Sequence, residues 1–394
     1  MEPPASPSRR AAPRLPGLDL LRAVAIGWVL IYHASLWDLA PQTNPLVGFG
    51  WMGVDLFFVL SGFLIAGQLL RPFARGQRPS YARFLTRRAL RTLPAYLVVV
   101  AIYFLVPAWR EWPDIQPPWT FLTFTQNLSP APFAPHSFSH AWSLCVEEQF
   151  YLVFPLALGL IALRPKPGTV IGAFVAVLVF GLLIRGWFWL HDIASPKFDI
   201  FGSPDGPYMR LIYYPTWSRL DGLLAGIAAA AVQTLRPAWW ARLTSRPNLL
   251  LAAGLVGVAA AAALFQREIG GFFAAVFGYP LIALSMAALV TGGASAASVI
   301  GRRAIPGAGA LAAGSYSLYL SHKMVIHAVA AAAKGWSPAA HVLALPLALL
   351  CAGIAGAALY WSVERPFLKL RERLGGPSRT SLAAKAPAMV EGVS

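Results

Sequence analysis

Long apolar runs recur along the chain and are separated by short breaks in which proline, glycine and arginine collect. A helix needs about 20 apolar residues to cross the ~30 Å hydrocarbon core of a bilayer. The runs predict ten membrane-spanning helices, at residues 17–38, 50–70, 89–108, 142–163, 168–190, 212–232, 248–265, 272–292, 308–331 and 341–361. The expected fold class is therefore an all-α integral membrane protein, a bundle of about ten transmembrane helices.

Composition supports this class and argues against a soluble protein. Hydrophobic residues make up 57% of the 394 residues and charged residues 12%, against roughly 25% charged in soluble domains. The net charge of +16 could indicate a nucleic-acid ligand, but its distribution favours membrane topology. Of the 32 Lys and Arg residues, 22 fall on one face of the predicted bundle, tails included, and five in the opposite loops. Because basic residues collect in cytoplasmic loops, both termini are predicted to be cytoplasmic, and no nucleic-acid partner is expected.

The domain organisation follows from these spans. We expect a basic cytoplasmic tail at 1–16, a ten-helix membrane domain at 17–368, and a basic, disordered cytoplasmic tail at 369–394. The first apolar run lacks a small-residue cleavage site, which favours a retained helix over a signal peptide. No appended soluble domain and no internal repeat are apparent, and the missing repeat weakens a transporter interpretation. The two cysteines lie inside apolar segments, so no disulfide framework is predicted.

Several charged side chains lie inside the predicted spans, where they are costly and usually functional. Arg22 and His33 are 11 residues apart, which returns to nearly the same face of the first helix. Ser143, Glu147 and Tyr151 share a face of the fourth span, since each follows the last by four residues. Asp55, Arg219 and Asp221 fall at a depth similar to that of His33 and Glu147. These groups predict a polar cavity that opens outward. The alternative is that they form ion pairs and hydrogen bonds that hold the helices together.

An arginine stripe begins the third span. Arg83, Arg87 and Arg91 are spaced by four, and Arg88 lies three before Arg91. Cytoplasmic topology alone would account for Arg83, but Arg91 lies at or below the membrane boundary. Guanidinium groups bind phosphates in a bidentate manner, so an anionic donor such as a coenzyme A thioester is a reasonable ligand.

Six motifs, in order and covering about residues 15–368, resemble those of the acyltransferase-3 family of membrane O-acyltransferases. They are LDLLRAVAIGWVLIYH, GVDLFFVLSGFLI, FLTRRALRTLP, AWSLCVEEQFYLVFP, SRLDGLLAG and GSYSLYLSHKMVI, and the ERP sequence at Glu364–Pro366 follows them. The resemblance implies transfer of an acyl group, acetyl by default, from acyl-CoA to a hydroxyl of a surface glycan, a lipid-linked glycan or a glycosylated metabolite. It also implies a multi-pass protein of the bacterial cytoplasmic membrane, acting alone or with a separate partner outside that membrane.

Residue by residue, the resemblance places the family's paired Arg and His on Arg22 and His33, its basic motif on Arg88 and Arg91, and its WSL-x-x-E motif on Trp142, Ser143 and Glu147. Two positions depart from the family pattern: Cys145 where a serine is frequent, and Lys323 where an aromatic residue is usual.

The hypothesis from these residues is that His33 acts as general base on the acceptor hydroxyl, or in the alternative takes the acyl group itself. Glu147 is expected to orient the imidazole. The phosphates of acyl-CoA, the co-substrate, are expected on Arg22, Arg87, Arg88 and Arg91. Substrate contact or support is expected from Asp55, Ser61, Trp142, Ser143, Tyr151, Arg219, Asp221 and His322. No metal and no bound cofactor are expected. Two alternatives are a proton-coupled transporter or exporter of a glycolipid or metabolite, and a non-catalytic scaffold.

Overall fold

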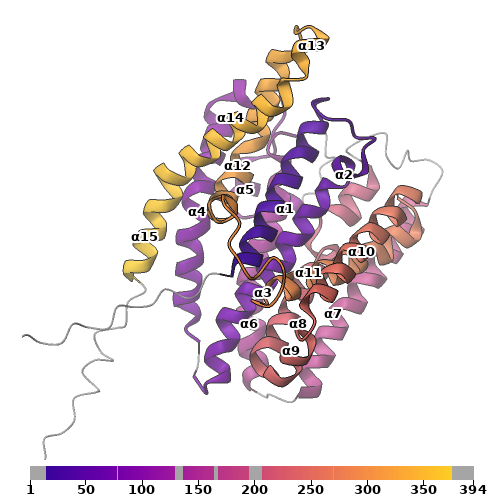
Figure 1. Ribbon diagram of the computed structural model, residues 1–394, viewed down its shortest axis with the longest axis vertical. Helices are drawn as coiled ribbons and strands as arrows, with labels where there is room; N and C mark the ends of the chain where they lie inside the picture. The colour runs from indigo at the N-terminus through magenta and orange to yellow at the C-terminus, as the bar shows by residue number, and fades with distance from the viewer. Residues whose placement is uncertain are drawn as a thin grey trace, which may run out of the picture.

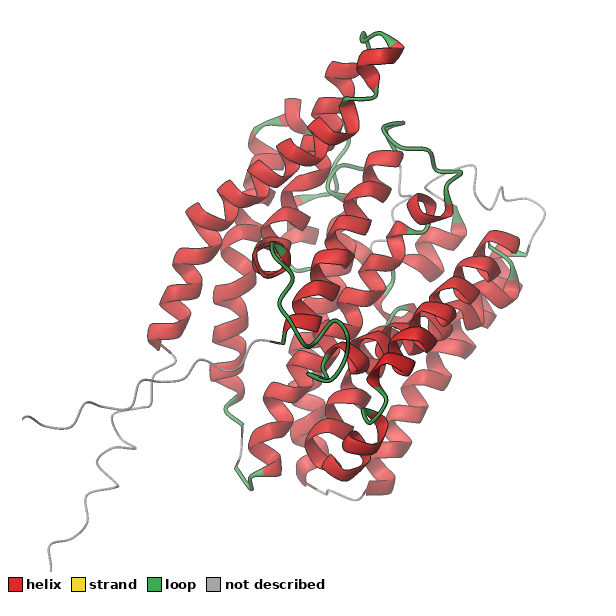
Figure 2. Ribbon diagram, viewed as in Figure 1, coloured by secondary structure: helices red, strands yellow, loops and turns green. Residues whose placement is uncertain are grey.

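The computed structural model describes residues 15–77, 79–128, 136–163, 167–194, 206–268 and 270–374. Within these ranges the chain is helical and has no β-strand (Figure 2). The longer helices are α1 (Pro16–Ser35), α3 (Gly53–Ala74), α4 (Tyr81–Leu105), α6 (Trp142–Leu163), α7 (Pro167–Phe188), α8 (Asp221–Leu235), α10 (Pro247–Arg267), α11 (Tyr279–Gly293), α12 (Ala308–Ala333), α14 (Ala344–Leu359) and α15 (Arg365–Leu374). The all-α class predicted from the sequence is therefore confirmed for the described residues.

The short elements connect these helices or extend their ends. They are α2 (Pro45–Gly48), η1 (Gly50–Met52), η2 (Pro107–Trp109), α5 (Pro118–Leu122), η3 (Gln126–Leu128), η4 (Ser139–Ala141), η5 (Trp189–Ile193), η6 (Met209–Tyr213), η7 (Thr216–Ser218), α9 (Pro237–Leu243), η8 (Ala274–Gly278), α13 (Pro338–His341) and η9 (Tyr360–Glu364).

Eight helical segments among the described residues are long and apolar enough to cross a membrane. They are Pro16–Ser35, Pro45–Ala74, Tyr81–Leu105, Ser139–Leu160, Gly168–Ile193, Pro247–Arg267, Ala274–Gly293 and Pro338–Leu374. The other two predicted spans correspond to α8, which has 15 residues, and to α12, whose 26 residues include polar side chains near its middle. The protein is thus a multi-pass membrane protein, whereas the count of ten and the cytoplasmic termini stay predictions.

The last long helix continues past residue 368, where the sequence predicts the membrane domain to end. It is extended by α15 to Leu374. The π-helical turn η9 directly precedes α15, which contains Pro366. A wider turn at this point accommodates the proline, whose ring clashes with the preceding turn of a regular α-helix. Figure 1 shows α14 and α15 as one long rod at the edge of the bundle. Residues 375–394 and 1–14, the rest of both predicted tails, lie outside the described residues.

Two hydrophobic cores share the central helices α1 and α3. One core gathers buried side chains of α4, α6, α12 and α14 around them, and the other gathers those of α8, α10 and α11. In Figure 1, α4, α12 and α14 lie on one side of α1, and α10 and α11 lie on the other. Because α1 and α3 contribute to both cores, residues on their faces can contact either half of the bundle.

Small residues bring α3 and α8 into the most extensive helix–helix contact of the described structure. A Cβ atom at Gly226 of α8 would overlap the carbonyl oxygen of Val59, and one at Gly62 of α3 would overlap that of Leu223. Lipid tails are as apolar as the helices, so helices in a membrane associate through close packing and not through a hydrophobic driving force. Small residues at the interface permit this close packing.

We expect Gly226→Ala to destabilise the folded protein by about 1–3 kcal/mol or more, because the overlapping atoms are backbone and cannot rotate away. Gly172→Ala in α7 is the matched control, since a Cβ there meets no atom within 4 Å. The thermal midpoint of the detergent-solubilised protein measures the difference. Equal midpoints for the two variants would contradict this account of the α3–α8 contact.

Candidate active site

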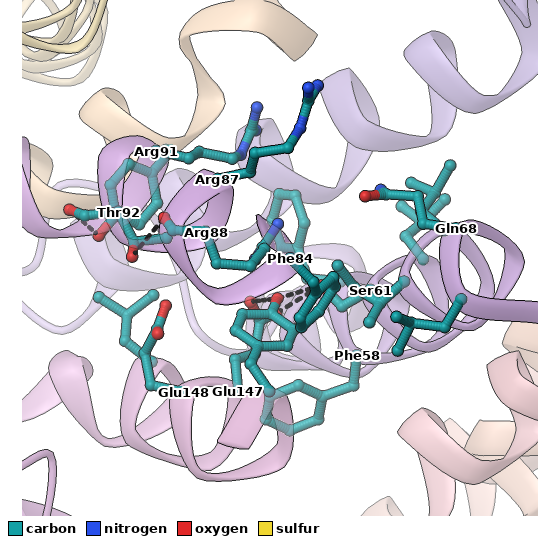
Figure 3. Close-up of a pocket in the computed structure, with 18 of the residues that line it drawn as sticks. Phe58, Ser61, Gln68, Phe84, Arg87, Arg88, Arg91, Thr92, Glu147 and Glu148 are labelled. Atoms are coloured by element: carbon teal, nitrogen blue, oxygen red, sulfur yellow. Dashed lines mark hydrogen bonds between the residues drawn. The ribbon is translucent and has the colours of Figure 1, made fainter. Parts of the chain in front are cut away.

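An elongated cavity of about 710 Å³ lies among α3, α4, α6 and α12 (Figure 3). It is lined along α3 from Val54 to Pro72, and these residues lie 18 positions apart. At 1.5 Å per residue this corresponds to about 27 Å along the helix axis, close to the thickness of a hydrocarbon core. One end, at Gln77 and Pro79, reaches the loop predicted to be cytoplasmic. The cavity therefore extends along most of the length of α3.

Arginine dominates the charge of this cavity. Its lining includes Arg22, Arg83, Arg87, Arg88, Arg91 and Arg371. Among the described residues, two carboxylates, those of Glu147 and Glu148, line it as well. Six guanidiniums against two carboxylates make the cavity a positive site, which attracts anionic ligands.

Local sequence explains why the arginines of α4 gather there. The Ser80 hydroxyl accepts a hydrogen bond from the backbone N–H of Arg83 at 3.3 Å and caps α4, so this helix begins eight residues before the predicted span. The arginine motif consequently lies inside one continuous helix. In Figure 3, Arg87 and Arg91 point away from the two glutamates, while Arg88 extends towards Ser61.

The structure brings together all four arginines predicted to bind acyl-CoA and adds one that the sequence did not reveal. Arg371 comes from α15, which packs against α4. Nothing in the local pattern around Arg371 distinguishes it from other basic residues of the predicted tail, since only the packing of α15 places it at the cavity.

Glu147 lies on the cavity wall within a network of hydroxyl groups. Its Oε1 accepts a hydrogen bond from Ser61 Oγ at 2.8 Å, and its Oε2 accepts one from the Tyr151 hydroxyl at 2.6 Å. The guanidinium carbon of Arg88 lies 3.8 Å from the centroid of the Tyr151 ring. The predicted shared face of Glu147 and Tyr151 thus produces a direct contact.

Glu148 lines the cavity beside Glu147 but was not singled out from the sequence. The sequence contains an indication of its importance, because a second glutamate in an apolar helix is as costly as Glu147. The i, i+4 spacing that groups Ser143, Glu147 and Tyr151 does not include Glu148.

His33 does not have the partner that the sequence predicted. Its Nδ1 atom lies 2.9 Å from Nε2 of His322, and no hydrogen bond joins it to Glu147 in the described structure. Both oxygens of Glu147 are occupied by hydroxyl donors on the cavity wall instead. The depth estimate placed His33 and Glu147 at one level, but His33 is in the last turn of α1, and its neighbours come from α12 and η4.

Three histidine rings cluster behind the end of the cavity that lies away from Gln77 and Pro79. The ring centroid of His322 lies 4.8 Å from that of His33 and 5.0 Å from that of His140. His140 is buried, and neither of its ring nitrogens has a hydrogen-bond partner. His140 lies between the predicted spans 89–108 and 142–163, in a loop predicted to be on the outer side. Its position in this loop did not predict the contact with His322. Within the described residues, no group of three or more His, Cys, Asp or Glu side chains is arranged to hold a metal ion.

Ser143 and Tyr319 separate the cavity from this histidine cluster. Both line the cavity, and their hydroxyl oxygens lie 2.7 Å apart. The Tyr319 hydroxyl also donates a hydrogen bond to the backbone oxygen of His140 at 2.9 Å. In this structure His33 is therefore not among the side chains that line the cavity, and one layer of side chains stands between them.

Trp142 and the charged residues Asp55, Arg219 and Asp221 lie outside the cavity, and the three charged side chains are in ion pairs. Arg219 Nη2 contacts Asp55 Oδ1 at 2.8 Å, and the Arg219 guanidinium stacks on aromatic rings that include Trp142, 5.0 Å away. Asp221 pairs with Arg185 of α7 at 2.6 Å. These contacts correspond to the helix-joining alternative considered for the charged residues, and they tie α3, α7 and α8 together.

Comparison with known proteins identifies the class to which this all-helical bundle with its arginine-lined cavity belongs. Residues 15–363 match the family model of the acyltransferase-3 family, described as an acyltransferase domain. The chain belongs to this family, as the six motifs indicated.

Among similar curated proteins are the O-acetyltransferases OatA of two strains of Staphylococcus aureus, NCTC 8325 / PS 47 and MRSA252. Each is 32% identical over 235 residues, which cover 55% of this chain and 34% of the relative. The chain thus spans about a third of the length of these relatives. No solved structure matches.

Proposed function

We propose that the protein is a membrane O-acyltransferase that moves an acetyl group from acetyl-CoA to a hydroxyl of a sugar-containing acceptor. The observation that carries this proposal is the cavity, which is lined by arginines and ends one side-chain layer from the His33–His322 pair. Family membership supports acyl transfer, and the names of the similar OatA proteins support acetyl transfer to oxygen.

The donor end follows from charge. Coenzyme A carries phosphate groups, which planar guanidiniums bind with paired hydrogen bonds. In the proposal these phosphates lie on Arg87, Arg88 and Arg91, beside the loop predicted to be cytoplasmic. The apolar side chains of α3 that line the rest of the cavity, such as Phe57 and Leu64, would contact the pantetheine arm and direct the thioester towards Tyr319.

In the proposed chemical step, His33 acts as the general base. As the acceptor oxygen attacks the thioester carbonyl, His33 removes the hydroxyl proton. The new C–O ester bond forms, the C–S bond breaks, and the proton passes from the imidazolium to the departing thiolate, so CoA leaves as a thiol. Ser143 and Tyr319 must move aside for the carbonyl to reach His33, because they close the cavity in this structure.

The acceptor is proposed to be a surface glycan, a lipid-linked glycan or a glycosylated metabolite, modified on the outer side of the bacterial cytoplasmic membrane. The His33 end of the bundle is predicted to face outward, which supports this side for the acceptor. A separate partner outside the membrane could take part in the final transfer.

Release of free CoA tests this function. Protein in proteoliposomes is supplied with acetyl-CoA and a panel of sugars and glycosylated metabolites, thiol release is followed by a colorimetric reagent, and acetylated products are sought by mass spectrometry. We expect acceptor-dependent thiol release together with an acetylated product. Vectorial movement of a glycolipid or metabolite without thiol release would favour a transporter and contradict the proposal.

Removing one phosphate-binding arginine should weaken donor binding. We expect Arg91→Gln to raise KM for acetyl-CoA by about tenfold or more, since a hydrogen bond to a charged group contributes ~1.5–3 kcal/mol. Arg242→Gln is the matched control, because Arg242 is an exposed residue of α9 outside the cavity. Steady-state kinetics in the same assay measure both variants. An unchanged KM in Arg91→Gln would remove this arginine from the donor site.

A further inference from the structure

His322 uses both of its ring nitrogens in the described structure. It lies near the middle of α12 with none of its surface exposed. Its Nδ1 is 2.7 Å from the backbone oxygen of Tyr319, and its Nε2 is 2.9 Å from Nδ1 of His33. These two contacts decide which nitrogens carry protons.

A backbone carbonyl can only accept a hydrogen bond, so Nδ1 of His322 must be the donor to Tyr319. A neutral imidazole carries one N–H, which leaves Nε2 of His322 as a lone-pair acceptor. The contact with His33 then requires that His33 donates from Nδ1. Nε2 of His33 is consequently the nitrogen that keeps a free lone pair.

The surroundings of His322 favour its neutral form. Around it are His33 from α1, His140 from η4, and Lys323, whose Nζ donates to Ser139 Oγ at 2.6 Å. None of these groups is a carboxylate. A buried imidazolium would therefore lack a compensating anion, and burial without one disfavours the charged form.

We propose that His322 is the positioning residue that holds His33 in the tautomer required of a general base, the role that sequence reasoning gave to Glu147. Nε2 of His33 faces the acceptor hydroxyl and takes its proton, while Nδ1–H stays bonded to Nε2 of His322. The same hydrogen bond stabilises the imidazolium as it forms, because its donor becomes charged. This inference rests on the proposed function for the identity of the reaction and on the hydrogen-bond chain for the tautomer.

The tautomer can be measured without any activity. In protein labelled with ¹⁵N-histidine and embedded in lipid, ¹⁵N chemical shifts distinguish a protonated ring nitrogen from a lone-pair nitrogen. His33→Ala identifies the His33 signals by their disappearance. We expect a protonated Nδ1 and an unprotonated Nε2 for His33 in the unaltered protein. A protonated Nε2 on neutral His33 would overturn the inference, whatever the activity of the protein.

Two substitutions of His322 then separate positioning from packing. His322→Gln places an amide oxygen near the former Nε2 and can still accept from His33, whereas His322→Phe fills the space without an acceptor. We expect the phenylalanine variant to lower kcat by on the order of 10²-fold or more with KM for acetyl-CoA unchanged, since His322 lies outside the donor cavity. The glutamine variant should retain most of kcat and the His33 tautomer. Equal losses in both variants, or an unchanged kcat in the phenylalanine variant, would contradict a positioning role.

Failure of this inference is distinguishable from failure of the proposed function. If the protein releases no CoA with any acceptor but shows the expected ¹⁵N pattern, the hydrogen-bond chain stands and the proposed reaction falls. If it releases CoA but His33 carries its proton on Nε2, the reaction stands and the role of His322 falls.

Discussion

His33→Ala is expected to lower acyl transfer by about 10²–10⁴-fold, the usual contribution of a positioned acid–base group. The loss should appear in kcat, because the donor cavity that sets the affinity for acetyl-CoA does not include His33. Folding should survive, since His33 is only partly buried and lies in the last turn of α1. Thiol release from acetyl-CoA in proteoliposomes, with the amount of inserted protein matched between samples, measures the effect.

The control for this substitution is His191→Ala. His191 is an exposed histidine of η5, away from the three-histidine cluster, so its loss should leave transfer unchanged. Added imidazole provides a second arm: a small base that enters the space left by His33 should restore part of the rate. Full activity in His33→Ala would remove this residue from the mechanism.

Breaking the buried pair between Asp55 and Arg219 is expected to cost about 3–5 kcal/mol of stability, because the partner left behind is an uncompensated buried charge. Arg219 would retain its hydrogen bond to the Tyr213 backbone oxygen and its aromatic neighbours, but no carboxylate contact. Asp55→Leu and Arg219→Met should each reduce the yield of monodisperse protein and lower its unfolding midpoint in detergent.

The double variant Asp55→Leu with Arg219→Met is the informative control. Replacing both charges by apolar groups removes the unpaired ion, so the double variant should be less destabilised than either single one. Additive losses would show that the two residues contribute independently and that their ion pair is not what joins α3 to the start of α8.

Helix positions were predictable because each depends on a local quantity. The apolar run of α10, for example, was predicted at 248–265 and is found at Pro247–Arg267, since a bilayer-length helix satisfies its own backbone hydrogen bonds. The arginines of α4 were grouped correctly for the same reason: i, i+4 spacing is a property of one helix. The end of the last predicted span, residue 361, falls within η9, where a π turn continues the helix towards Pro366.

The sequence predicted that the charged side chains would have partners on other helices, but not which residues these partners are. The sequence indicated that Asp55, Arg219, Asp221, His33 and Glu147 could not lie in lipid unpaired, because an isolated charge there is too costly. It could not say which would pair, since a shift of a few ångströms along one helix exchanges one partner for another. Glu147 thus lies with Ser61 and Tyr151, and Asp221 lies with Arg185.

By itself the sequence determined the class of protein, the order of its helices, and a family identity carried by six ordered motifs, because those properties lie in composition, periodicity and local spacing. Only the tertiary structure decided that His33 meets His322, that Arg371 reaches the cavity, and that Ser143 and Tyr319 close the cavity short of the base. The physical reason is that hydrogen bonds and ion pairs act over about 3 Å, while the depth and rotation of neighbouring helices are set by packing among many side chains at once.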